Sequence, residues 1–264
     1  MKPIINIFIA LFFAANLISA QDTLYVYKAG KVAYKSAVNT VDSVSFMYIE
    51  PVEGTLNDND GHTYTYKKIG TQFWMTENLK TTKYRNGDAI SNPLVDADWN
   101  AATYGAWCNY NNDAANGTKY GKLYNWYAVN DSRKIAPTGW HVATDAEWTI
   151  LETYVYTNYG TSISAVKALA TTTDWTTNGT AGTIGNNLAI NNYSGFSALP
   201  GGYRSSAGGT PFWDIVSHGY WWSTTESDAS YAWYRSLRYD ANGVGWYYAT
   251  KSSGFSVRCV RDSQ

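Results

Sequence analysis

The chain is poor in the residues that build most metal sites, and its charges nearly balance. Its 264 residues hold 2 cysteines and 3 histidines, and 20 basic residues stand against 21 acidic ones, a formal net charge of −1. Without a basic block there is no electrostatic case for binding nucleic acid. The histidines, His62, His141 and His218, lie far apart, so no metal-ligand spacing of His or Cys occurs.

Long apolar runs are equally scarce, and the clearest lies at the N-terminus. Lys2 precedes an apolar run from Ile4 to Ala15, and the segment ends in the small residues Ser19 and Ala20. This pattern is typical of a secretory signal peptide cleaved after Ala20. The alternative is a membrane anchor, but the run is shorter than the ~20 residues that a spanning helix needs. We therefore predict a secreted or outer-surface protein with no transmembrane segment after cleavage.

Aromatic residues are the abundant class. The chain has 12 Trp, 23 Tyr and 8 Phe, which make up 16% of its residues, together with 22 Gly. Disordered chains are poor in aromatics, so this composition excludes disorder and indicates a folded domain rich in strands and loops. The length favours one large domain, or one domain with a short appendage.

Two cysteines, Cys108 and Cys259, remain after cleavage. In an exported protein, two distant cysteines are a candidate disulfide. The equal alternative is a pair of buried free thiols that behave as small apolar side chains.

Before the main domain, the chain shows the pattern of a short β-rich segment. Residues 24–27 and 32–34 are strand-like and joined by a Gly-containing turn, which predicts a hairpin, and 41–46 alternates as a third strand. We predict three parts: a signal peptide over 1–20, a β-rich leader with a linker over 21–53, and one domain over 54–264.

Within that domain, the patterns predict an α+β fold. Thr144 and Glu147 form a capping box, so a helix is expected over 145–157, and a shorter one over 164–170. Residues 91–120 are rich in Asn, Asp, Ala and Gly and are expected to be mostly loop. Short strands are expected over 63–69, 73–75, 220–225, 232–239, 246–249 and 255–260.

Six blocks in a fixed order make the domain recognisable. They are Gly70–Leu79, Tyr120–Ala128, Pro137–Trp148, Gly195–Arg204, Tyr220–Thr224 and Phe255–Asp262. Together they resemble the Fibrobacter succinogenes major paralogous domain family over about residues 54 to 264. One departure is Ala136, where many members carry a Cys.

That family is similar to the C-type lectin-like superfold, which formylglycine-generating enzymes share. The resemblance implies two helices packed on an antiparallel sheet with long loops. It implies no general activity. Formylglycine-generating enzymes use two closely spaced cysteines near the C-terminus, and here Cys259 stands alone, which argues against that oxidase chemistry.

No catalytic residue set is predicted. Asn111, Asn112 and Asp113 offer hard oxygen ligands, so Asn111 and Asp113 are candidate calcium ligands and calcium is the one cofactor considered. The alternative is an Asx-rich turn whose side chains bond their own backbone.

Aromatic side chains in expected loops give the positive signal for binding, because Trp and Tyr stack on sugar rings and anchor protein contacts. These candidates are Trp99, Trp107, Trp175, Trp213 and Trp246. The loop that begins at Arg204 and ends at Trp213 is favoured together with Asn109 to Asp113. The predicted ligand-contacting residues are Trp107, Asn111, Asn112, Asp113, Arg204, Trp213 and Trp246.

The leading hypothesis is a non-catalytic binding protein that recognises a glycan or a surface protein. One alternative is a structural or assembly component of the cell surface, docked through the leader hairpin. A third hypothesis, a polysaccharide-acting hydrolase, needs two carboxylates across a cleft, which sequence alone does not reveal.

Overall fold

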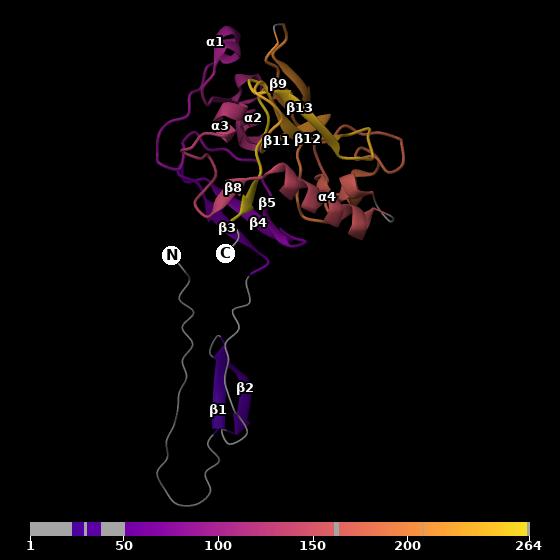
Figure 1. The fold of residues 1–264 in the computed structure, drawn as a ribbon. Helices are drawn as coiled ribbons and strands as arrows, with labels where there is room; N and C mark the ends of the chain where they lie inside the picture. The colour runs from indigo at the N-terminus through magenta and orange to yellow at the C-terminus, as the bar shows by residue number, and fades with distance from the viewer. Residues whose placement is uncertain (1–22, 29–30, 38–50, 161–163, 208, 263–264) are drawn as a thin grey trace, which may run out of the picture. The chain divides into compact units, whose positions relative to one another are not determined.

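Two antiparallel strands precede the main domain. The computed structural model describes residues 23–28, 31–37, 51–160, 164–207 and 209–262 (Figure 1). Contacts divide the chain into two units, Met1–Glu50 and Pro51–Gln264. In the first unit, β1 (Thr23–Lys28) pairs antiparallel with β2 (Lys31–Ala37), as the hairpin pattern predicts. The predicted signal peptide and the predicted strand over 41–46 lie outside the described residues.

One five-stranded sheet joins the two ends of the second unit. Its order is β3 (Glu53–Asn57), β4 (Thr63–Ile69), β5 (Gln72–Met75), β14 (Cys259–Arg261) and β8 (Trp140–Val142). The strand β14 lies between β5 and β8, so Val260 is in register with Trp74 on one side and His141 on the other. All pairs in this sheet are antiparallel.

A second five-stranded sheet holds most of the C-terminal third. Its order is β10 (Phe212–Ile215), β9 (Gly201–Arg204), β11 (His218–Glu226), β12 (Tyr231–Arg238) and β13 (Gly245–Thr250). The β9–β11 pair is parallel and the others are antiparallel. A two-stranded ladder pairs β6 (Trp107–Cys108) with β7 (Leu123–Tyr124).

The longest helix begins where the capping box predicts. Helix α4 (Asp145–Tyr159) has the reciprocal Thr144 and Glu147 bonds, and its buried face is Trp148, Leu151 and Val155. It is followed by α5 (Ala165–Leu169), which confirms the second predicted helix. The architecture is α+β, as expected. Among the described residues, no helix has both the length and the apolar character to cross a membrane.

Two segments differ from expectation. The region 91–120, expected to be mostly loop, contains α1 (Asp96–Ala101), the 3₁₀ turn η2 (Tyr110–Asn112) and α2 (Ala114–Tyr120). Burial of Trp99 and the cap at Asp113 outweigh the poor helix propensity there. The expected strand over 255–260 is regular only in β14, because Phe255 and Ser256 form isolated bridges. The remaining short helices are α3 (Trp126–Val129) and η3 (Leu188–Ile190).

Aromatic rings fill the core between α4 and the sheets. The ring of Trp74 lies 4.9 Å from that of Trp148 and 5.6 Å from that of Phe196, and Trp148 lies 6.3 Å from Trp221. Each such ring buries about 150–250 Å², so the abundant aromatics are largely a packing device. A second cluster surrounds Trp222, and a third, smaller one surrounds Trp99.

A buried guanidinium crosses this core. Arg258 is fully buried, and its Nε donates to Asn78 Oδ1 at 2.7 Å. Its Nη1 donates to the carbonyls of Met75 and Phe196, and its Nη2 donates to that of Ser197. Burial lowers the pKa of Arg258 to about 9, so the group is still charged at neutral pH. Among the described residues, no ion pair involves Arg258, so the dipoles of the three backbone carbonyls stabilise its charge.

Asn78 extends this network to the second sheet. Its Oδ1 also accepts a hydrogen bond from Trp221 Nε1 in β11 at 2.8 Å. Its Nδ2 donates to the carbonyl of Tyr120 and to Ser256 Oγ. We call Asn78, Trp221 and Arg258 the buried polar hub.

We predict that Arg258→Met destabilises the domain by about 3 kcal/mol or more, because the carbonyls of Met75, Phe196 and Ser197 lose a donor and Asn78 Oδ1 loses one of its two donors. Urea unfolding followed by tryptophan fluorescence measures the loss. The matched control is Arg238→Met, whose side chain is 53% exposed and pairs with Asp240, and which should cost under about 1 kcal/mol. Equal losses in the two variants would contradict the role of the hub.

Candidate functional site

The predicted ligand loop at Asn111 to Asp113 is exposed and turns back on its own backbone. Asn111 and Asn112 adopt left-handed φ values of 54° and 55°, which Asn tolerates better than most residues. Asp113 Oδ1 accepts the N–H of Ala115 at 2.9 Å and caps α2. This is the Asx-turn arrangement, and the calcium site at Asn111 and Asp113 stays a prediction.

Arg204 is not at the surface. Its side chain is fully buried and forms an ion pair with Asp96 at 2.7 Å. The guanidinium lies 4.4 Å from the ring of Trp99 and 5.2 Å from that of Phe212. Arg204 is therefore a structural residue that ties α1 to β9, which corrects the prediction that it contacts a ligand.

The other predicted aromatics divide between core and surface. Trp99 and Trp175 are buried, so neither can meet a ligand. Trp107 is half-buried, donates Nε1 to the carbonyl of Ile90, and has Lys122 Nζ 4.4 Å above its ring. Trp213 is 47% exposed on β10. Tyr110 packs on Phe212 with ring centroids 5.3 Å apart, so the loop at 109–113 lies beside β10.

Both cysteines are buried free thiols in the structure. Cys108 belongs to the cluster around Trp99, whereas Cys259 belongs to the cluster around Trp222. Burial raises the pKa of Cys108 to about 12 and that of Cys259 further, so neither thiol is reactive at neutral pH. This arrangement is the second of the two alternatives that the sequence left open.

Trp246 is part of a larger aromatic surface on β12 and β13. On one face of this strand pair lie Tyr231, Trp233, Trp246 and Tyr248, which we call the aromatic strip. Trp233 stacks on Trp246 with centroids 4.7 Å apart and an interplanar angle of 22°. Tyr248 meets Trp233 at 5.7 Å and Tyr231 at 5.4 Å, both edge to face. Trp246 is 53% exposed and Tyr248 58% exposed.

The indole of Trp246 is held in place before any ligand arrives. Its Nε1 donates to Asp145 Oδ1 at 3.0 Å, at the start of α4. Arg235, 2% exposed, lies opposite Trp246 on β12 and pairs with both Asp145 and Glu152. Burial raises the pKa of Glu152, and the Arg235 guanidinium opposes that rise. Because stacking and hydrogen bonding fix the ring, a ligand would pay little conformational entropy to bind it.

The other strip members, Tyr231, Trp233 and Tyr248, were not predicted from the sequence as binding residues. Trp233 lies in the strand predicted over 232–239, with Tyr231 directly before that strand, and Trp246 and Tyr248 lie in the strand predicted over 246–249. The spacing of two residues within each of these pairs places the pair on one face. What the sequence alone did not show was the register, which sets Trp233 opposite Tyr248.

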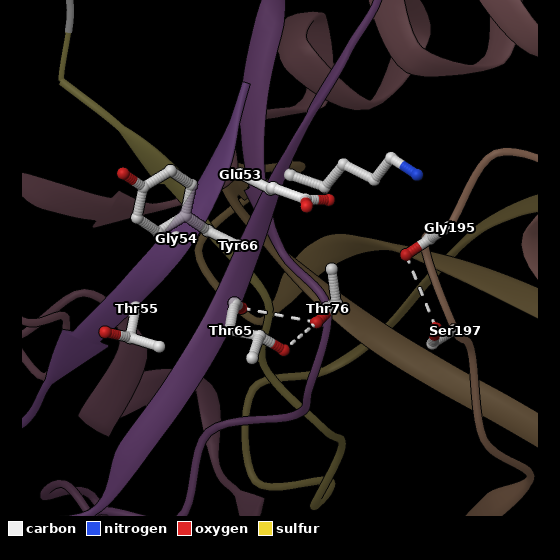
Figure 2. Close-up of a pocket in the computed structure, with 9 residues that line it drawn as sticks. Glu53, Gly54, Thr55, Thr65, Tyr66, Thr76, Gly195 and Ser197 are labelled. Atoms are coloured by element: carbon white, nitrogen blue, oxygen red, sulfur yellow. Dashed lines mark hydrogen bonds between the residues drawn. The ribbon is translucent and has the colours of Figure 1, made fainter. Parts of the chain in front are cut away.

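A groove of about 460 Å³ lies on the other five-stranded sheet (Figure 2). Its wall residues are Glu53, Gly54, Thr55, Thr65, Tyr66, Lys67, Thr76, Gly195 and Ser197. Among the described residues, no hydrogen bond or ion pair involves the Glu53 carboxylate or the Lys67 ammonium. Tyr66 is the one aromatic residue among those that line the groove, and its ring packs on Trp140 with centroids 5.3 Å apart.

Among the described residues, one group brings three potential metal ligands of the His, Cys, Asp or Glu type together: Asp58, Asp60 and His62. Asp58 accepts bonds from His62 and Tyr64, and Asp60 accepts bonds from the Thr82 backbone and hydroxyl. These carboxylate oxygens already accept hydrogen bonds from the protein, so the group is explained as a turn that these hydrogen bonds stabilise.

The other two histidines, His141 and His218, also lie beside carboxylates, but neither forms a nucleophilic triad. His141 Nδ1 is 2.7 Å from Asp262 Oδ1, and its Nε2 is 2.7 Å from Glu147 Oε1. Both ring nitrogens therefore face carboxylates, and none is left for a nucleophile. At His218, Ser217 Oγ and Asp214 approach the same nitrogen, Nδ1, whereas a triad uses opposite nitrogens.

Comparison with known proteins identifies the class. Residues 68–261 match the model of the Fibrobacter succinogenes major domain, and the chain belongs to that family. This confirms the resemblance carried by the six sequence blocks. No curated protein and no solved structure matches the chain.

His141 should make stability depend on pH. The hydrogen bond to Glu147, helped by Asp262, raises the pKa of His141 above its ordinary value of 6.5. The protonated His141 ring therefore stabilises the folded state fully below pH 6.5, and this stabilisation is lost as pH rises through the raised pKa. Burial alone would raise the pKa of Glu147, but bonds from His141 and Thr144 lower it from 4.5, so protonating Glu147 removes the effect at acid pH.

We therefore expect the stability difference between wild type and His141→Gln to be largest between about pH 4.5 and 6.5, measured by urea unfolding across pH. His218→Gln is the control. Burial lowers the pKa of His218, so the folded state favours the neutral ring. The stability difference between wild type and His218→Gln should therefore grow as pH rises. The same pH trend in both variants would contradict this account.

Proposed function

We propose that this protein is a non-catalytic glycan-binding domain, and that the aromatic strip is its binding surface. The observation that carries the proposal is an exposed, pre-positioned Trp246 stacked on Trp233 and flanked by Tyr248. Aromatic faces bind the apolar faces of sugar rings, and hydroxyls at the ring edge then need polar neighbours. Asp145 and the Tyr231 and Tyr248 hydroxyls supply such neighbours beside the strip.

The strip suits this role better than the groove on the other sheet or the predicted loops. The one aromatic ring that lines the groove, Tyr66, packs on Trp140, and Arg204, the first residue of the loop that was favoured from sequence, is buried. Trp213 is the remaining well-exposed predicted tryptophan. It lies on β10, at the opposite edge of the sheet from β13, so one small glycan would not span both.

We further infer a C-type lectin-like fold and an exported protein. A capped helix followed by a short one, antiparallel sheets and long connections support the fold assignment. The apolar segment over 1–20 supports secretion or an outer-surface location, with a leader and linker over 21–53 ahead of the binding domain. Export would bring the strip into contact with glycans outside the cell.

Binding should be tested with residues 21–264 on an array of plant and host polysaccharides, with calcium and again with chelator. We expect selective binding that survives chelation, because the strip holds no cluster of metal ligands. Trp246→Ala should weaken that binding about tenfold or more, since it removes the exposed stacking face.

Tyr104→Ala is the matched control, because Tyr104 is 52% exposed and forms no part of the strip. It should bind as wild type does. The proposal would be refuted if the protein bound no polysaccharide on the array, or if wild type and Trp246→Ala bound equally well. Binding lost on chelation would instead point to Asn111 and Asp113.

A further inference from the structure

The strand β13 lacks the usual protection of a sheet edge against pairing. Within the part of the chain that the structure describes, it is the last strand of its sheet, and its six residues, Gly245–Thr250, include no charge and no proline. Its ladder with β12 has no bulge. Strands at sheet edges normally carry such features, because unpaired N–H and C=O groups bind other strands.

The other edges of the two five-stranded sheets are protected. At the far edge of the same sheet, Pro211 precedes β10, and Asp214 has a φ of 66° within the strand. In the other sheet, β3 begins with the exposed Glu53, and β8 is only three residues long. The contrast singles out β13 as the edge that is built to pair.

We propose that two copies of this chain pair through β13, antiparallel and centred on Tyr247, to form one continuous sheet. The proposal does not depend on glycan binding. It rests on the hydrogen-bond pattern of β13, on the self-complementarity of that pattern and on the aromatic side chains that the pairing would cover.

The β12–β13 ladder shows which backbone groups of β13 are free. The N–H of Lys251 donates to the carbonyl of Ser230 at 3.0 Å, so 230 and 251 form a hydrogen-bonded pair. Such pairs alternate along an antiparallel ladder, which makes Tyr247 bond inward to Tyr234. Trp246, Tyr248 and Thr250 are then the residues of β13 whose N–H and C=O groups point outward.

Those outward groups are complementary to themselves. With a two-fold axis at Tyr247, Trp246 lies opposite Tyr248 of the partner subunit, and the reverse pair forms on the other side of the axis. Both residues point outward, so each pair exchanges two hydrogen bonds and the dimer gains four. Shifting the register by one residue would set an outward group against an inward one, so the alternation excludes that shift.

The side chains also fit the pairing. Trp246, Tyr247 and Tyr248 are 53%, 58% and 58% exposed, and aromatic cross-strand pairs stabilise a sheet. The two-fold axis runs perpendicular to the sheet, so the aromatic strips of the two copies lie on the same face. The dimer would thus present one doubled strip. Tyr247 lies on the opposite face, where it meets its own counterpart.

The test uses residues 21–264 in sedimentation equilibrium over about 1 to 300 µM. We expect wild type to form a dimer within this range. Tyr247→Lys sets like charges face to face at the two-fold axis, and should weaken dimerisation about tenfold or more. Tyr193→Lys adds the same charge at a residue that is 53% exposed elsewhere, and should dimerise as wild type does.

Mixing Tyr247→Lys with Tyr247→Glu tests the register directly. Residue 247 faces itself only in the proposed arrangement, so the mixture should form a heterodimer at concentrations where each variant alone is monomeric. A wild-type monomer at 300 µM, an undisturbed Tyr247→Lys dimer or a mixture that stays monomeric would each overturn the proposal.

Amide hydrogen exchange gives a readout that needs no variant. The amides of Trp246 and Tyr248 should exchange more slowly as concentration rises, whereas that of Tyr247, bonded to β12, should be protected throughout. Exchange at 246 and 248 that does not change with concentration would contradict pairing. Tyr247 is not part of the aromatic strip, so glycan binding by Tyr247→Lys can be measured separately from its dimerisation. The glycan measurement tests the proposed function, and the dimerisation measurement tests this inference.

Discussion

The structure depends on a buried cation, Arg258, which has no anionic partner among the described residues. Arg258, on the segment leading into β14, donates four hydrogen bonds, three to backbone carbonyls and one to the side-chain amide oxygen of Asn78. An unpaired buried charge would be very costly, so these acceptors must all be in place at once. The requirement makes the fold specific as well as stable, because few other arrangements of the chain would supply the same set of acceptors.

The hub also explains how the aromatic strip is held in place. Arg258 fixes the loop at Phe196 and Ser197, and Asn78 connects the first sheet to Trp221 in β11. The next strand, β12, carries Arg235, whose guanidinium joins the sheet to α4 through Asp145 and Glu152. Asp145 in turn orients Trp246. A continuous set of contacts thus runs from the core to the aromatic strip.

Much of the fold could be predicted because local signals were strong. The capping box at Thr144 and Glu147 placed α4 within two residues, and alternating aromatics placed β11, β12 and β13. The candidate site was harder, because it depends on register and long-range burial. Arg204 was predicted to contact a ligand, because the sequence does not show that its partner is Asp96 in α1, 108 positions away. Trp99 was predicted to lie in a loop, because the sequence does not show that its ring packs on Arg204. Trp246 was found, but Trp233 and Tyr248 became part of a site only through the pairing of two strands.

The most direct test of the central claim follows the indole N–H signals of the twelve tryptophans by ¹⁵N NMR during titration with a soluble oligosaccharide of the polysaccharide that binds best. The account predicts that Trp246 and Trp233 shift first, since they form the exposed stack, while the buried Trp74, Trp148 and Trp221 stay unchanged. Shifts confined to Trp213 or Trp107, with Trp246 unmoved, would place the binding surface elsewhere and contradict the account.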